Sequence, residues 1–161
     1  MRVHIFITSL ILIIITLIVF FSEQNSQSEY LRCNTHVNSI VTLKDSKKID
    51  INVTINAVIN SNNDGQFKLV GSIKTDNDNY TLSRRLFITL KKSDFKKLTK
   101  AVIVREEQYP IDDTPDELWE KLILPETVGS EFYLEIKYLD ENTILVKELS
   151  HPYFICSVEP N

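Results

Sequence analysis

Apolar and polar residues alternate along most of the chain beyond residue 30, and this alternation predicts β-strands. The clearest case is the segment 49–59, where every odd position is isoleucine, valine or alanine and most residues between them are polar. A period of two indicates a strand with one buried face. Turn-forming residues separate such segments at 61–65 and 76–79. The pattern predicts about eight antiparallel strands, at 30–43, 49–59, 67–73, 80–90, 101–105, 132–138, 143–149 and 153–158.

The segment after the fifth of these strands predicts a helix. Thr114 is a favourable N-cap, Pro115 suits the first helical turn, and Glu117 would complete a capping box. We predict that Trp119, on this helix, is a core residue or an interface anchor rather than a platform on which a ligand stacks. Eight antiparallel strands and one helix in about 140 residues predict a mainly-β, lipocalin-like barrel or half-barrel, with an interior that could hold a small ligand.

Residues 3–21 are almost entirely apolar and contain no acidic residue, lysine, arginine, glycine or proline. As a helix this segment would be about 28 Å long, enough to cross the hydrocarbon core of a bilayer. We interpret it as an uncleaved transmembrane anchor, because no small-residue motif typical of a signal-peptide cleavage site follows it. Arg2 precedes the segment and acidic residues follow it, so the positive-inside rule predicts a cytoplasmic N-terminus. The predicted organisation is a short cytoplasmic tail and anchor at 1–21, a juxtamembrane linker at 22–29 and an exported β-rich domain at 30–161.

The charge of the chain argues against nucleic acid as a direct partner. The net charge is −4, and Arg2 is the one charged residue of 1–21, which leaves −5 for the rest. A net negative domain repels phosphate backbones. Lysines nevertheless gather in two places, which we interpret as solvated loops and strand edges. The clusters are Lys44, Lys47 and Lys48, and Lys91, Lys92, Lys96, Lys97 and Lys100.

The two cysteines, Cys33 and Cys156, predict a disulfide bond. An even number of cysteines in an exported domain is typical of disulfide bonding, and zinc sites instead use cysteines in close pairs with further ligands. The predicted bond would tie the first strand to the last strand. The alternative is two buried free thiols.

The sequence contains no nucleophile elbow, P-loop, dinucleotide fingerprint or HExxH motif, and we predict a protein that is neither an enzyme nor a cofactor binder. One dense acidic patch could in principle bind a metal. We attribute it instead to acids that complement a helix dipole, and predict no metal site. The patch consists of Asp112, Asp113, Asp116 and Glu117.

His36 and His151 suggest a pH-sensing hypothesis. If Cys33 and Cys156 lie directly opposite each other on neighbouring strands, both histidines fall on the sheet face opposite the disulfide. Two neighbouring imidazoles would resist simultaneous protonation, which suits an acid sensor in an exposed compartment. The alternative is two ordinary surface histidines.

The layout of the chain resembles the FidL-like family of small bacterial inner-membrane proteins, and also the PsaF/MyfF-like and ToxS-like partner proteins. The matching features are the N-terminal anchor, the early Cys33, the segment YPIDDTPDELW at 109–119 and the ending HPYFIC at 151–156. The resemblance implies a single-pass protein of the bacterial inner membrane, with its N-terminus in the cytoplasm and its β-rich domain in the periplasm.

The resemblance also implies a function. Such proteins are periplasmic partners of ToxR-like one-pass transcription factors, which they stabilise, and related pairs form a shared lipocalin-like barrel. Some of these pairs respond to bile salts or to acid, and they control virulence genes that include fimbrial genes. We therefore expect a co-regulator that forms a heterodimer with a ToxR-like transmembrane regulator and takes a small apolar ligand such as a bile salt. The alternatives are a self-sufficient lipocalin-like ligand binder and an assembly factor for surface structures.

Overall fold

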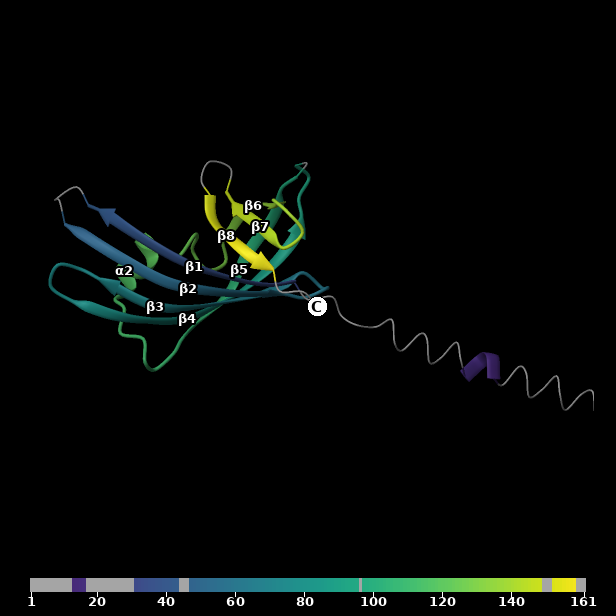
Figure 1. Cartoon of the computed structure of the whole chain (residues 1–161), viewed down its shortest axis with the longest axis horizontal. Helices are drawn as coiled ribbons and strands as arrows, with labels where there is room; N and C mark the ends of the chain where they lie inside the picture. Colours follow the sequence, from purple (N-terminus) through teal and green to yellow (C-terminus); the bar gives the residue numbers. More distant parts are fainter. Residues whose placement is uncertain (1–12, 17–30, 44–46, 96, 149–151, 159–161) are drawn as a thin grey trace, which may run out of the picture.

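The computed structural model describes residues 13–16, 31–43, 47–95, 97–148 and 152–158. Eight antiparallel strands and one short helix, α2, follow one another along the chain (Figure 1). Each strand pairs with the next, and the last pairs with the first, which closes a barrel in the order β1 to β8. The elements are β1 (Leu31–Thr42), β2 (Lys48–Ile59), β3 (Asp64–Lys74), β4 (Asn79–Lys92), β5 (Thr99–Gln108), α2 (Asp116–Leu122), β6 (Glu131–Tyr138), β7 (Thr143–Lys147) and β8 (Pro152–Val158).

The alternating pattern of the sequence becomes the inside and outside of this barrel. On β2 the buried residues include Ile49, Ile51 and Val53, and the polar residues between them face outward. Ile73 on β3 and Leu82 on β4 are fully buried in the same core. The eight predicted strands are confirmed, with bounds that differ by a few residues. The alternating pattern predicts them well because each strand buries one apolar face, and this burial is the main apolar contribution to the stability of the fold.

The strands pair very unevenly around the barrel. β1 pairs with β2 along its whole length, from Leu31 to Thr42. On its other edge β1 pairs with β8 through Cys33 and Asn34. β5 likewise pairs with β6 through Thr99–Val102, although β5 extends to Gln108. The long strands β1 to β4 therefore form a curved trough that extends away from the short strands β6 to β8 (Figure 1). The barrel is closed at the end where β1 begins. Toward the other end it is open on one side, beyond the short pairing of β1 with β8.

A disulfide bond between Cys33 and Cys156 lies beside the short contact between β1 and β8, which confirms the predicted pairing of these cysteines. The two Cα atoms are 5.6 Å apart. Cys33, however, lies opposite Val158, so Cys156 is a diagonal neighbour and the directly opposite arrangement assumed for the histidine hypothesis is wrong. The separation of two residues keeps the strand parity, and His36 therefore faces outward while Cys33 is buried.

The helix α2 is confirmed, but the predicted capping box is wrong. The helix begins at Asp116 with Pro115 as its N-cap residue, and no side chain caps it. The hydroxyl of Thr114 instead donates a hydrogen bond to the carbonyl oxygen of Thr81, at 3.0 Å. A tertiary partner on β4 has thus replaced the local cap that the sequence predicted.

The predicted anchor and linker lie almost entirely outside the described residues. Within this region the structure describes residues 13–16, which form a helical turn in which Thr16 donates a hydrogen bond to the carbonyl oxygen of Ile13 at 2.8 Å. Across the described residues, no helix combines the length and the apolar character needed to span a bilayer.

Candidate functional site

An apolar pocket of about 270 Å³ lies inside the barrel. Its wall is formed by side chains of all eight strands, by the last residue of α2 and by the segment that follows α2. Nearly all of these side chains are aliphatic or aromatic, and among the described residues no lysine, arginine, aspartate or glutamate lines the pocket. An apolar cavity near the lower end of the usual size for ligand sites can hold a small hydrophobic molecule. Representative wall residues are Val53, Leu69, Leu86, Ile103, Phe132 and Phe154.

The polar groups of the pocket wall come from Ser39 on β1 and Tyr153 on β8. Burial raises the pKa of the Tyr153 hydroxyl to about 12, with further contributions from the charges of Glu148 and Glu126 and from a hydrogen bond to Glu148. Tyr153 is therefore neutral at physiological pH, and because its one hydroxyl proton is donated to Glu148, its oxygen is left to accept a hydrogen bond from a ligand. The two hydroxyls could orient the polar end of an otherwise apolar molecule.

The pocket lies beside the unpaired edge of β1. Val37, Ser39 and Val41 point into the pocket, and Ser39 is nevertheless exposed. The pairing of β1 with β8 ends at Asn34, so the segment 35–42 has no strand on that side among the described residues. We call this opening, bordered by the edge of β1 at 35–42, the seam. At the seam, the backbone N–H and C=O groups of β1 have no partner strand among the described residues. The wall of the pocket is open at the same place.

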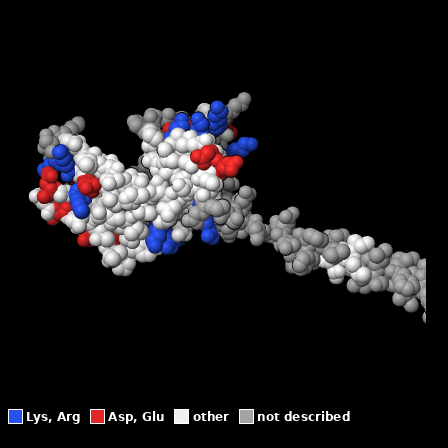
Figure 2. Space-filling model, viewed as in Figure 1, with Lys and Arg blue, Asp and Glu red and all other residues white. Residues whose placement is uncertain are grey.

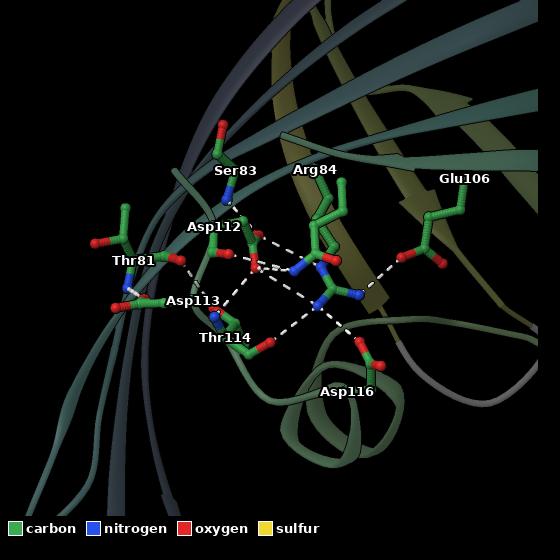
Figure 3. A network of polar contacts seen from close by, with 9 residues as sticks. Thr81, Ser83, Arg84, Glu106, Asp112, Asp113, Thr114 and Asp116 are labelled. Atoms are coloured by element: carbon green, nitrogen blue, oxygen red, sulfur yellow. Dashed lines mark hydrogen bonds and ion pairs between the residues drawn. The ribbon is translucent and has the colours of Figure 1, made fainter. Parts of the chain in front are cut away.

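A buried arginine anchors the segment that carries α2 (Figure 3). Arg84 on β4 has a side chain that is 3 % exposed, and its guanidinium forms ion pairs with Glu106 at 2.9 Å, Asp112 at 3.4 Å and Asp116 at 2.9 Å. It also donates a hydrogen bond to the carbonyl oxygen of Thr114 at 2.9 Å. Burial by itself lowers the pKa of Arg84, but hydrogen bonds to these carboxylates outweigh it and the pKa is raised.

Asp112 is the central acceptor of this network. Its carboxylate accepts hydrogen bonds from the backbone N–H of Ser83 at 2.7 Å and of Thr114 at 3.1 Å, in addition to its contacts with Arg84. Asp113 next to it accepts one from the N–H of Thr81 at 2.5 Å. These hydrogen bonds attach the loop before α2 to the first half of β4. The acidic patch therefore contains buried counter-ions and loop anchors, and the helix dipole explains only part of it.

Trp119 is a core residue. Its side chain is 1 % exposed, and the guanidinium of Arg84 lies 5.0 Å from the centre of its ring. Because the ring is enclosed by this chain, it cannot serve as an accessible interface anchor in this structure, and that part of the prediction is wrong. Trp119 contributes instead by fixing α2 against the barrel, through burial and a cation–π contact.

The pH-sensing pair is not assembled from described residues. His36 is exposed and its Nδ1 lies 3.1 Å from the hydroxyl oxygen of Thr54, the residue opposite it on β2. His151 lies outside the described residues. The structure therefore gives His36 a polar partner on its own sheet, and the histidine pair stays a prediction.

The comparison with protein families found a match to the part of the chain that contains the Arg84 network. A family model described as "FidL-like putative membrane protein" matches residues 71–156, from the middle of β3 to the disulfide cysteine of β8. This match spans more than half of the chain. The chain is a FidL-like protein. No curated protein matches it. The matched range includes Arg84, its acidic partners and Trp119, so the network that anchors α2 lies within the part of the chain that the FidL-like family model matches.

The burial of Arg84 in this FidL-like chain was not predicted from its sequence. The signal was present, because Arg84 has the same parity on β4 as Leu82 and Leu86, which face the core. An arginine at a core-facing position requires acidic partners. The acids at 112 and 116 were visible in the sequence, but their pairing with β4 depends on the path of the loop.

Proposed function

We infer that this FidL-like protein is the periplasmic partner of a ToxR-like one-pass transcription factor, and that the two chains meet at the seam. The observation that carries this proposal is the unpaired edge of β1 at 35–42. Unpaired strand edges accept strands of other chains, because their backbone N–H and C=O groups lack partners. A single strand from the regulator would pair with β1 and complete the wall of the barrel on that side.

In this proposal the protein is anchored in the bacterial inner membrane by residues 3–21, with a cytoplasmic N-terminus. Support comes from the apolar length of this segment and from membership of a membrane-protein family. The barrel then lies in the periplasm with the regulator's own periplasmic domain. Proteinase K added to spheroplasts should degrade the barrel and leave a short protected fragment, and resistance of the barrel would contradict this orientation.

Site-specific photocrosslinking tests the seam. A photoreactive phenylalanine analogue at Ile40, which is 68 % exposed on β1, should crosslink the regulator in native membranes. The matched control is Val70, which is 38 % exposed on β3, a strand that is paired on both sides. Mass spectrometry of the crosslinked product should identify a one-pass DNA-binding protein from position 40 and not from position 70. Crosslinks to pilus or secretion components would instead support an assembly factor, and crosslinks from position 70 alone would contradict docking at the seam.

The pocket favours a second candidate function, a lipocalin-like binder that takes a small apolar molecule without a partner. The pocket walls are already contributed by this chain alone. Calorimetric titration of the purified full chain with deoxycholate tests this function, since a bile salt has a rigid apolar body and a few polar groups. Val53→Phe should fill the pocket and abolish binding, whereas Val70→Phe on the outer face should not. Binding that needs the regulator would favour the shared barrel over the self-sufficient binder.

If the co-regulator function holds, deletion of the chain should lower expression of the regulator's target genes, which we propose to be virulence and fimbrial genes. Transcript measurement in the deletion strain and in a strain that carries the Val53→Phe protein separates two contributions. Loss in the deletion strain alone would indicate stabilisation of the regulator, and loss in both would indicate that an occupied pocket is required.

A further inference from the structure

The end of the barrel at which β1 begins carries three hairpin connections. Because all strands are antiparallel, Leu31 lies at the same end as the β2–β3, β4–β5 and β6–β7 connections and the end of β8. Figure 1 shows the β4–β5 connection projecting at the upper right of the view, above the β2–β3 connection. The chain enters the barrel here from its N-terminal segment. Any surface on which the N-terminal segment is anchored would therefore face these hairpins.

The β4–β5 connection presents an exposed aromatic ring among lysines. Phe95 is 62 % exposed at its tip. Lys91, Lys92 and Lys97 are exposed around it, and Lys97 adopts a left-handed conformation with φ 71°. On the adjacent β6–β7 hairpin, Tyr138 and Leu139 are also exposed, at 62 % and 48 %. Large apolar side chains flanked by lysines are typical of segments that lie at a membrane–water interface.

Within the described part of the chain the lysines of this hairpin are only partly compensated, because Lys97 interacts electrostatically with Glu135 and the hairpin carries one acid, Asp94. Lys91 lies directly opposite Lys100 on the paired strands β4 and β5, an arrangement of like charges that does not favour the hairpin by itself. Lys100 pairs with Glu131 at 2.7 Å, but no described carboxylate pairs with Lys91, Lys92 or Lys97. The hairpin therefore keeps a positive charge that an external anion could balance.

Both ends of the barrel carry charges of both signs. Figure 2 shows basic side chains at the upper right, above β6 and β7, with acidic side chains beside them, and a mixture of acidic and basic side chains at the opposite tip. At the opposite end the loop before α2 and the start of α2 are acidic, with Asp113, Asp116 and Glu117. Exposed apolar residues such as Ile40 and Ile111 occur near that end too. The end where β1 begins carries Phe95 at the tip of a hairpin on which three exposed lysines, Lys91, Lys92 and Lys97, outnumber one exposed acid, Asp94.

We propose that the β4–β5 hairpin, with Phe95 at its tip and Lys91, Lys92 and Lys97 around it, rests on the anionic lipid surface of the membrane that holds the anchor. This inference rests on the proposed anchoring of residues 3–21. The linker 22–29 can span at most about 28 Å when fully extended, so the end at which β1 begins must stay near the bilayer. When the hairpin rests on the bilayer, its lysines lie within the Debye length of about 8 Å over which the negative potential of anionic headgroups acts, and Phe95 enters the interface. The contact fixes the direction of the barrel and so sets which way the seam faces.

Tryptophan quenching by brominated lipid tests the contact in the full chain. The protein is reconstituted into nanodiscs of phosphatidylcholine alone or with phosphatidylglycerol, with brominated acyl chains in either case. Phe95→Trp should lose emission, and more so with phosphatidylglycerol present. The matched control is Ile40→Trp. Ile40 is 68 % exposed near the end of β1 that lies away from this surface, so a tryptophan there should keep its emission. The parent, whose one tryptophan is the buried Trp119, gives the background.

The contribution of charge is tested by a triple variant. Lys91→Gln, Lys92→Gln and Lys97→Gln together should abolish the extra quenching that phosphatidylglycerol causes. The control triple Lys47→Gln, Lys48→Gln and Lys74→Gln changes the net charge equally at the other end of the strands and should preserve the extra quenching. Far-UV circular dichroism establishes that each variant is folded.

The outcomes separate this inference from the proposed anchoring. Release of the parent from membranes by alkaline carbonate would contradict the anchor itself. A retained protein in which Phe95→Trp is unquenched, or in which Ile40→Trp is quenched instead, would overturn the docking of this hairpin. Equal quenching of Phe95→Trp in both lipid mixtures would overturn the role of anionic lipid.

Discussion

Arg84 is a buried charge whose compensation is divided among three carboxylates of very different exposure. The side chains of Asp112, Glu106 and Asp116 are 0 %, 21 % and 76 % exposed. Removing one partner of a buried ion pair destabilises strongly, because the remaining charge stays out of water. We predict that Asp112→Asn lowers the free energy of unfolding by about 3 kcal/mol, the lower end of the usual range, since two acids remain near Arg84.

Urea denaturation of the neutralised variants checks this. Asp112→Asn should be the least stable, Glu106→Gln should come second, and Asp116→Asn should be close to the parent, in the order of their burial. The control is Lys121→Gln, which breaks the exposed pair between Glu117 and Lys121 and should change little. The account of the network would be wrong if Asp116→Asn were the most damaging substitution.

Tyr153 makes stability depend on alkaline pH. Burial raises its pKa in the folded chain to about 12, above the ordinary value of 10.0. The folded state therefore holds this proton more tightly than the unfolded state does, and the resulting stabilisation is complete below pH 10 and is lost as the pH rises from 10 to about 12. The melting temperature of the parent should fall more steeply over this window than that of Tyr153→Phe. Tyr138→Phe, a change at an exposed tyrosine, should follow the parent curve, and parallel curves for all three proteins would rule out this contribution.

At the scale of the strands, Gly71 sets how closely β2 and β3 approach. A methyl group at this position would overlap the backbone carbonyl oxygen of Asn52 and lie 2.8 Å from the Cα atom of Val53. Backbone atoms of a paired strand cannot move aside without breaking the sheet, so Gly71→Ala should cost about 3 kcal/mol. Gly65→Ala is the matched control on the same strand. Its methyl group would meet the side chain of Ile88, at 2.7 Å, which can reorient. Denaturant unfolding should place Gly65→Ala between the parent and Gly71→Ala, and the reverse order would contradict this explanation.

The strands could be predicted from the sequence because each carries its own period of two, a local property that the barrel preserves. The disulfide could be predicted because Cys33 has a single possible partner in the chain. The cap of α2 was predicted wrongly because Thr114 bonds to Thr81, 33 residues away, and local sequence does not specify that contact. The pairing of β1 with β8 was misplaced by two residues for a related reason, since the meeting of the first and last strands depends on the combined stagger of all the others.

At the scale of the whole molecule, the position of the seam follows from unequal strand lengths. β7 and β8 have 5 and 7 residues, whereas β1 and β2 have 12 each. Short strands can cover only part of a long neighbour, and the stagger between β8 and β1 limits their pairing to two residues on each strand, so the pocket wall is open beside Ser39. The same inequality leaves the long hairpins to project beyond the closed end. An opening for a partner and a surface for the bilayer can therefore arise from one feature of the barrel.

We predict that the disulfide bond keeps this barrel closed. Cys33 and Cys156 are 123 residues apart, and in the chain-entropy model a loop of this length stabilises the folded state by at most about 4–5 kcal/mol. Between β1 and β8 the bond is accompanied by a pairing of two residues on each strand. We predict that the double substitution Cys33→Ser and Cys156→Ser lowers stability toward that limit and separates β8 from β1 before the sheet β1 to β4 unfolds. Hydrogen exchange should therefore accelerate first in β7 and β8, with β2 and β3 still protected, and reduction of the parent should reproduce this. Uniform acceleration over all strands would instead mean that the barrel opens as one cooperative unit and that the seam has no independent motion.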